Sequence, residues 1–190
     1  MILIVAGVSG SGKTTVGSML AGRLGWRFAD ADTFHPAANI AKMRAGVPLT
    51  DEDRWPWLRA IGAWMDQRIA AGESAVVTCS ALRRAYRDAL LDGRPRAQLV
   101  FLAVDREVVA HRLAARHGHF FPAQLLDSQF AALEPIGPGE RAVSIVPADD
   151  PSQTVADIIA VFRLGADPGS GAAIVAGASG SPGGDHEAEA

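Results

Sequence analysis

Short apolar runs alternate along the chain with longer stretches in which apolar residues recur every three or four positions. The short runs predict β-strands over residues 2–6, 26–29, 74–79, 98–104 and 141–146. The longer stretches predict helices over residues 13–24, 37–44, 57–71, 82–91, 106–113 and 154–163. This alternation predicts a five-stranded parallel sheet with helices on both faces, a three-layer α/β/α fold.

The C-terminal stretch differs from the rest of the chain in composition. Gly, Ala, Ser and Pro dominate from Gly165 to Gly184. Such a segment offers too little apolar surface to offset the entropy lost on ordering it. We therefore predict one domain over residues 1–164 and a disordered Gly/Ala/Ser-rich tail over residues 165–190.

The amino-acid composition limits the kinds of binding partner and the cellular compartment that are expected. The chain has 190 residues, 48% of them hydrophobic, and a net charge of -3, which argues against a nucleic-acid or anionic-membrane partner. Cys79 is the sole cysteine, so no intramolecular disulfide forms and a reducing compartment fits. No apolar run approaches the roughly 18 residues of a membrane span. We expect a cytoplasmic protein with no membrane partner.

A glycine-rich motif connects the first predicted strand to the first predicted helix. The pattern G-x-x-x-x-G-K-[ST] is matched by Gly7, Val8, Ser9, Gly10, Ser11, Gly12, Lys13 and Thr14. Glycines let backbone N–H groups turn around an anion, and the helix N-terminus adds further donors. Lys13 would neutralise the β- and γ-phosphates, and the Thr14 hydroxyl would bind Mg²⁺. The motif predicts ATP and Mg²⁺ as cofactors and Lys13 as a catalytic residue.

Other motifs distinguish among proteins with such a loop. A regulatory GTPase would need an N-K-x-D segment, but neither Lys13 nor Lys42, the two lysines, follows an asparagine. A kinase of a small metabolite remains the leading hypothesis, and an ATP-binding regulatory module is the alternative. Asp105 follows the fourth predicted strand and could be a Walker B carboxylate. The helical pattern directly after it favours a helix N-cap instead.

Several segments together resemble the gluconokinase family in order and spacing. Beside the phosphate loop they are Asp30-Ala-Asp-Thr-Phe-His-Pro36, Asn39-Ile-Ala-Lys-Met43, Gly46-Val-Pro-Leu-Thr-Asp-Glu-Asp-Arg54, Cys79-Ser-Ala-Leu-Arg-Arg-Ala-Tyr-Arg-Asp88, Arg112-Leu-Ala-Ala-Arg-His-Gly-His-Phe-Phe121 and Ser128-Gln-Phe-Ala-Ala-Leu-Glu134. The resemblance implies a fold like that of nucleoside-monophosphate kinases and phosphorylation of D-gluconate to 6-phosphogluconate. Family members often form homodimers, so it also allows a homodimer. Another small-metabolite kinase of the same fold, for shikimate or a nucleotide, is the alternative.

Two carboxylates follow the second predicted strand. Asp30 and Asp32 lie two residues apart, so on an extended segment their side chains share a face. One can support Mg²⁺ while the other accepts a proton from the attacking hydroxyl. By resemblance to the family and to shikimate kinases, Asp30 is assigned to the metal and Asp32 to substrate binding and catalysis. The alternative is that both stabilise the turn before Pro36.

A substrate such as gluconate, with a carboxylate and hydroxyls, calls for arginine and small polar groups. Arg54 is the first candidate, although Thr50 or Asp51 could cap a helix that leaves Arg54 solvated in its first turn. Arg83 is preferred over the adjacent Arg84, since a helix would not point both at one ligand. His35 either binds a substrate hydroxyl or fixes the turn before Pro36.

A lid is predicted over about residues 112–134. Arg112 and Arg116 lie four apart, hence on one helical face, ahead of a glycine and two phenylalanines. Arg112 is predicted to bind the nucleotide, and Arg116 to stabilise charge on the transferring phosphoryl group; the alternative is an exposed arginine stripe. No Cys, Asp or Glu lies at ligand spacing from His117 and His119, so a metal site there is rejected.

Overall fold

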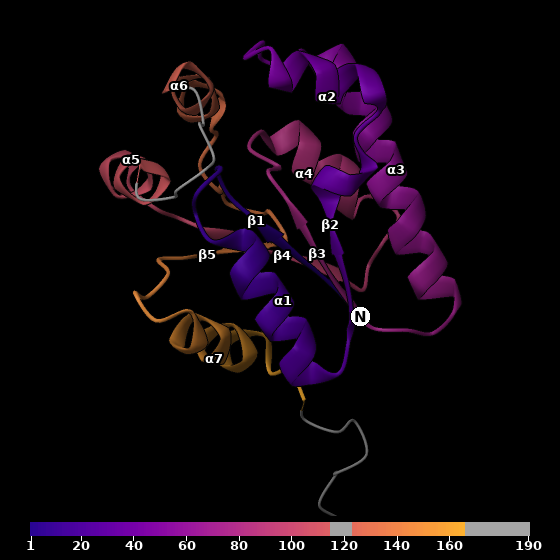
Figure 1. The fold of residues 1–190 in the computed structure, drawn as a ribbon. Coiled ribbons are helices and arrows are strands. Elements are labelled where there is room, and N and C mark those ends of the chain that lie inside the picture. Colours follow the sequence, from indigo (N-terminus) through magenta and orange to yellow (C-terminus); the bar gives the residue numbers. More distant parts are fainter. Residues whose placement is uncertain (115–122, 166–190) are drawn as a thin grey trace, which may run out of the picture.

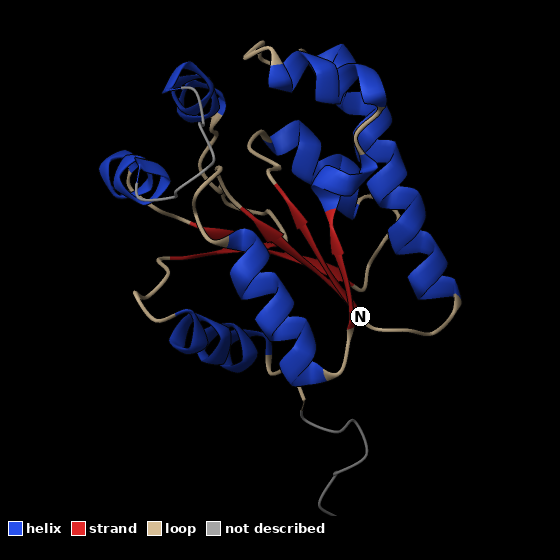
Figure 2. Ribbon diagram, in the orientation of Figure 1, coloured by secondary structure: helices blue, strands red, loops and turns tan. Residues whose placement is uncertain are grey.

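A computed structural model of the protein describes residues 1–114 and 123–165. A parallel sheet lies at its centre, in the strand order β2-β3-β1-β4-β5 (Figures 1 and 2). The strands are β1 (Ile2–Ala6), β2 (Arg27–Asp30), β3 (Ala75–Cys79), β4 (Ala97–Leu102) and β5 (Ala142–Ile145). The prediction of a five-stranded parallel sheet is confirmed.

Helices cover both faces of the sheet (Figure 1). They are α1 (Lys13–Leu24), α2 (Ala37–Arg44), α3 (Asp51–Ala70), α4 (Arg84–Leu91), α5 (Arg106–Ala114), α6 (Ala123–Ala132) and α7 (Pro151–Phe162), with a short 3₁₀ helix η1 (Ala31–Phe34) after β2. Leu3 and Val5 pack with α1 and α7. Ile2, Ile4 and Ala6 face the opposite way, into a core with α3 and α4. Alternate side chains of β1 thus enter two separate cores, as expected of a central strand.

Helix α3 begins at Asp51, so its predicted start at residue 57 is wrong. A capping box formed by Thr50 and Asp53 fixes the start of this helix. The Asp53 N–H donates to Thr50 Oγ1 at 3.4 Å, and the Thr50 N–H donates to Asp53 Oδ2 at 2.9 Å. Pro56 lies inside the helix at the cost of one backbone hydrogen bond. Thr50 therefore caps α3, and Arg54 lies in the first turns of this helix.

Two other helix starts differ from the prediction. Helix α4 begins at Arg84 instead of residue 82, because Arg83 before it is extended, with φ -95° and ψ 149°. Helix α7 begins at Pro151 instead of residue 154. Asp150 caps it by accepting from the Ser152 N–H at 2.9 Å, and proline is well suited to the first helical position.

The ends of the strands define where a ligand can bind. All five strands are parallel, so their carboxyl ends meet at one edge of the sheet. The glycine-rich loop leaves β1 there, Asp30 ends β2 and Cys79 ends β3. This is the edge at which open parallel sheets bind ligands. Across the described part of the chain, no helix has the length and apolar character needed to cross a membrane.

Candidate active site

The glycine-rich loop folds closely around its own backbone. At Gly7, where φ is +146°, a Cβ would lie 2.7 Å from Ser11 Oγ and 3.0 Å from the Leu102 carbonyl oxygen. Only glycine fits this position without displacing the backbone of β4. The loop then passes directly into α1, whose first hydrogen bond runs from the Val16 N–H to the Gly12 carbonyl at 2.9 Å. The loop therefore ends at a helix N-terminus, the geometry that binds phosphate.

Side chains of the motif already meet their expected neighbours. Lys13 Nζ donates to the Val8 carbonyl oxygen at 2.8 Å, which folds the lysine over the loop. Thr14 Oγ1 donates to Asp30 Oδ2 at 2.8 Å, joining the start of α1 to the end of β2. The structure thus brings together two of the oxygens that the sequence assigns to a metal.

The Thr14 and Asp30 oxygens fit a magnesium ion. Adjacent ligands of an octahedral Mg²⁺ lie about 2.9 Å apart when each is 2.0–2.1 Å from the ion, close to the observed 2.8 Å. Within residues 1–114 and 123–165 no group of three His, Cys, Asp or Glu side chains could hold a metal by itself. Such a sparse site is typical of Mg²⁺ that retains waters and binds substrate phosphates.

Asp32 lies beside this pair, in η1. Its backbone N–H donates to Asp30 Oδ1 at 3.1 Å, which orients the Asp30 carboxylate toward Thr14. The protein atoms crowded around the Asp32 carboxylate raise its pKa, although part of its surface reaches solvent. The Asp30 charge raises the pKa further, and Lys13 opposes both effects. A carboxylate with a raised pKa is a better proton acceptor, as a general base requires.

His35 is held in place by Trp57 and Asn39. Its ring stacks on that of Trp57, with centroids 4.3 Å apart and planes 9° from parallel. Burial, followed by the charge of Arg54, lowers the pKa of His35 to about 4, so the imidazole is neutral near pH 7. Asn39 Nδ2 lies 3.4 Å from His35 Nδ1, which favours the tautomer with its proton on Nε2. His35 can therefore donate a hydrogen bond to a ligand.

The two candidate arginines both lie close to the ring of Tyr86. The guanidinium carbon of Arg54 is 5.8 Å from the centre of the Tyr86 ring, and that of Arg83 is 5.9 Å from it. Arg83 Nη1 donates to both carboxylate oxygens of Asp51, at 2.7 and 2.9 Å, and Tyr86 donates its O–H to Asp51 at 2.6 Å. Arg54 forms no ion pair with any residue of the described ranges. Arg54 alone of the two is available to an anionic ligand.

Arg84 and Asp105 lie at the starts of α4 and α5. Arg84 Nε pairs with Asp88 Oδ2 at 3.4 Å on the exposed face of α4. The Asp105 carbonyl accepts from the Val109 N–H at 3.1 Å, the first hydrogen bond of α5. Asp105 therefore occupies the N-cap position, as the sequence favours.

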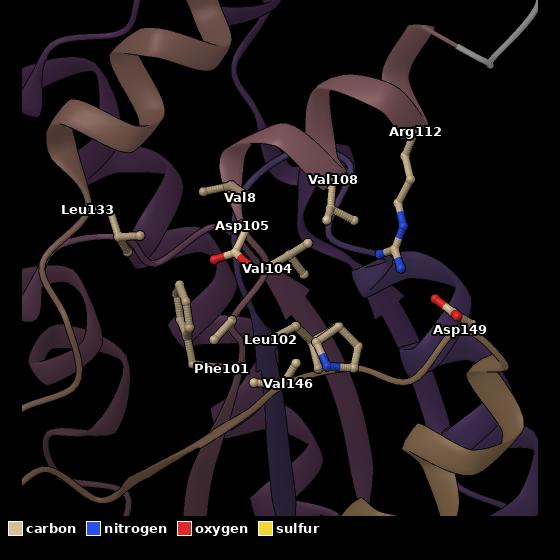
Figure 3. A pocket seen from close by; sticks show the side chains of 12 residues that line it. Val8, Phe101, Leu102, Val104, Asp105, Val108, Arg112, Leu133, Val146 and Asp149 are labelled. Carbon is tan, nitrogen blue, oxygen red and sulfur yellow. The ribbon is translucent and has the colours of Figure 1, made fainter.

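A cavity of about 460 Å³ adjoins the glycine-rich loop on the side of α5 and α7. It is lined by Gly10, Ser11, Gly12, Thr15, Val16, His111, Arg112, Pro147, Ala148, Asp149, Pro151 and Thr154. A neighbouring cavity of about 310 Å³ lies at the carboxyl end of β4, where Val104 and Val108 give it an apolar wall (Figure 3). Arg112, Pro147 and Asp149 line both. Because these cavities adjoin the phosphate-binding loop, they could accommodate the ribose and base of a nucleotide.

The predicted lid is described only in part. Helix α5 carries Arg112 beside the glycine-rich loop, and α6 returns toward it. Arg116, His117 and His119 lie outside the described residues. Residues 166–190, which contain nearly all of the predicted tail, lie outside them as well.

The structure adds three site residues that the sequence does not identify. Asp51 and Tyr86 hold Arg83, and Gln129 of α6 contacts the glycine-rich loop at Ser9. Asp51 looks like a helix-capping residue, and Tyr86 falls in a helical pattern. The Ser128–Glu134 segment resembles the gluconokinase family, but nothing in its pattern indicates contact with residue 9.

Comparisons with known proteins show the family of the chain. Residues 2–136 match a protein family described as an AAA domain. The chain is 44% identical over 161 residues to a gluconokinase of Gluconobacter oxydans, covering 85% of this chain and 90% of that protein. A solved gluconokinase from Sinorhizobium meliloti superposes with a TM-score of 0.76 at 43% identity, covering 85% of this chain and 91% of that one. The unliganded structure of a sugar kinase from Janibacter sp. HTCC2649 superposes with a TM-score of 0.81 at 46% sequence identity, covering 86% of this chain and 95% of that one. The chain belongs to the gluconokinase family of P-loop kinases.

Proposed function

We propose that this protein transfers the γ-phosphoryl group of ATP to the 6-hydroxyl of D-gluconate, with Asp32 as the general base. The observation that supports it is that Lys13 of the phosphate loop, the Asp32 carboxylate of raised pKa and Arg54, which has no ion pair in the described part of the chain, all lie close enough to Cys79 at the end of β3 for their charges to act on it. Membership of the gluconokinase family gives the reaction class and the substrate.

ATP is bound through its phosphates by residues 7–14. The backbone N–H groups of the loop and the N-terminus of α1 supply donors and a positive dipole end. Lys13 neutralises charge that develops between the β- and γ-phosphates. The base and ribose occupy the cavities beside Arg112. Thr14 and Asp30 would hold Mg²⁺, which would neutralise charge on the phosphates.

The transfer itself needs one proton acceptor on the substrate side. The proton of the gluconate 6-hydroxyl passes to the Asp32 carboxylate as the hydroxyl oxygen bonds to the γ-phosphorus. The bond from that phosphorus to the β,γ-bridging oxygen breaks, and ADP leaves with the electron pair. We assign stabilisation of the transferring group to Lys13 and Arg116, and a hydrogen bond to a substrate hydroxyl to His35.

The gluconate carboxylate is assigned to Arg54. Arg83 is already bound to Asp51 through both carboxylate oxygens, so a substrate would have to displace that pair. Arg54 has no such partner among the described residues, and it influences the pKa of His35, which places its charge near the substrate-binding histidine. Arg83 therefore borders the substrate and fixes Asp51 and Tyr86, and Arg54 binds the anion.

D-Glucitol provides the test, because it has the same open carbon chain with a neutral hydroxymethyl group in place of the carboxylate. A charge-assisted hydrogen bond contributes about 1.5–3 kcal/mol, so Arg54→Gln should reduce the preference for gluconate over glucitol about 10- to 100-fold. Arg83→Gln is the matched control and should retain most of that preference, even if kcat/KM falls for both acceptors. The assignment is wrong if Arg83→Gln abolishes the preference and Arg54→Gln leaves it intact.

A further inference from the structure

Gln129 of α6 binds the phosphate loop through both ends of its carboxamide. The Ser9 N–H donates to Gln129 Oε1 at 2.7 Å, and Gln129 Nε2 donates to Ser9 Oγ at 2.9 Å. Both side chains are half-buried. One side chain thus fixes the backbone and the hydroxyl of the same loop residue, across a sequence separation of 120.

The next residue of the loop, Gly10, lies against helix α5. At Gly10 a Cβ would lie 3.0 Å from Val109 Cγ1 and 3.0 Å from Leu113 Cγ, both on α5. The tip of the loop therefore lies against α5 at Gly10 and is hydrogen-bonded to α6 at Ser9. Contacts with two helices distant in sequence hold this tip, so its shape is not a local property of the glycine-rich motif.

The contact between Gln129 and Ser9 also affects which backbone N–H groups of the loop are available to a ligand. The Ser9 N–H is taken by Gln129, and the Ser11 N–H by the Val8 carbonyl at 3.2 Å. Within the described part of the chain, the N–H groups of Gly10 and Gly12 have no hydrogen-bond partner. N–H groups left in this way in a glycine-rich turn form an anion-binding concavity.

We propose that Gln129 is a positioning residue for phosphoryl transfer, which holds Ser9 so that the tip of the loop is preorganised for the β- and γ-phosphates. A carboxamide suits this task because it accepts from the N–H and donates to the hydroxyl at the same time. A carboxylate has nearly the same shape, but it cannot donate to Ser9 Oγ and would place a negative charge beside the triphosphate. The inference rests on the proposed use of ATP.

The experiment compares nucleotides that differ only in their phosphates. Binding of ATP, ADP and AMP is measured by titration calorimetry for wild type, Gln129→Ala and Gln129→Glu. Since AMP lacks the phosphates that lie in the loop, we expect the variants to lose about tenfold in affinity for ATP and ADP and less than about twofold for AMP. Gln129→Glu should lose more than Gln129→Ala, because like charges repel. Gln67→Glu, an exposed glutamine of α3 with the same charge change, should match wild type.

A purely structural role gives a different result. It would lower the melting temperature and reduce the affinity for all three nucleotides equally, and that outcome, or wild-type ATP affinity in a folded Gln129→Ala, would overturn the proposal. Ser9→Ala removes the Nε2 contact and keeps the backbone one, so it provides the same test if the Gln129 variants do not fold. It should show a smaller loss that is still selective for ATP and ADP. Gluconate turnover by wild type tests the proposed function separately.

Discussion

Replacing Glu140 by alanine should destabilise the protein strongly, because it leaves a buried arginine without its counter-ion. The Arg87 side chain is 0% exposed and that of Glu140 is 2% exposed. Arg87 Nε and Nη2 donate to the two Glu140 oxygens at 2.6 and 3.0 Å, and Nη1 donates to the Leu82 and Glu134 carbonyls at 2.9 and 3.0 Å. The arginine thereby joins the loop before α4 to the segment after α6.

The expected loss of folding free energy follows from the burial of this ion pair. Removing one member of a buried ion pair costs about 3–5 kcal/mol, because the remaining charge stays desolvated. For a protein of this size each kcal/mol lowers the melting temperature by about 2–4 °C, so Glu140→Ala should lower it by about 6–20 °C. The Asp66–Arg94 pair is the matched control, since Asp66 is 56% exposed; Asp66→Asn should cost less than about 1 kcal/mol.

Urea unfolding followed by circular dichroism measures both free energies, and pH provides a second check. The hydrogen bond from Arg87 holds the pKa of Glu140 below its ordinary value. A carboxyl group whose pKa is lower in the folded protein stabilises above the unfolded-state pKa of about 4.3, and that contribution is lost as the pH falls through the folded pKa. The difference between wild type and Glu140→Gln should therefore shrink on acidification below about pH 4.3. Equal losses for Glu140→Ala and Asp66→Asn at pH 7 would refute the reasoning.

The remaining predictions concern the reacting groups. Lys13→Ala should stay folded and lose at least about a hundredfold in kcat, because the lysine stabilises transition-state charge; wild-type turnover would contradict this. Asp32→Asn should reduce kcat at least about a hundredfold and leave ATP affinity within about threefold, as stopped-flow and calorimetry can show. Since the pKa of Asp32 is raised, the wild-type rate should fall on acidification at a pH above the ordinary aspartate pKa of about 3.9. Asp30→Asn should instead raise the Mg²⁺ concentration for half-maximal rate, and an exchange of these two phenotypes would exchange the assigned roles.

The sequence predicted the layers of the fold because the signals for them are local. Apolar runs predicted all five strands, and α1 ends at the predicted residue 24, where Gly25 adopts a left-handed conformation. The predicted starts of α3 and α4 were wrong, because the apolar pattern does not show where a helix is capped. The predicted start of α3 missed the capping box at Thr50, and the extended Arg83 places the start of α4 at residue 84. The order of the strands depends on contacts between distant segments, which the hydrophobic pattern does not contain.

The candidate site was predictable where its chemistry lies in one continuous motif. The phosphate loop needed only spacing, and the structure places Thr14 against Asp30. The roles of Asp30 and Asp32 came from the family resemblance, and the extended segment expected for the pair ends at Asp30, because Asp32 lies in the 3₁₀ helix η1. The contact between Asp51 and Arg83 spans 32 residues and depends on how α3 packs on α4. No local pattern distinguishes an arginine bound by a neighbouring carboxylate from one that is available to a substrate.

Product analysis by ³¹P NMR tests the central claim most directly. The purified protein is incubated with ATP and Mg²⁺ and, in separate samples, D-gluconate, shikimate or a nucleoside monophosphate, while ADP release gives kcat/KM for each acceptor. We expect gluconate to be the best acceptor by at least about a hundredfold. Shikimate also carries a carboxylate, but its hydroxyls lie on a rigid ring and cannot reach the positions that those of an open-chain acid reach. The phosphorus signal should couple to the protons on C6, which identifies 6-phosphogluconate. Equal or better kcat/KM with shikimate or a nucleotide, or phosphate on another hydroxyl, would contradict the account.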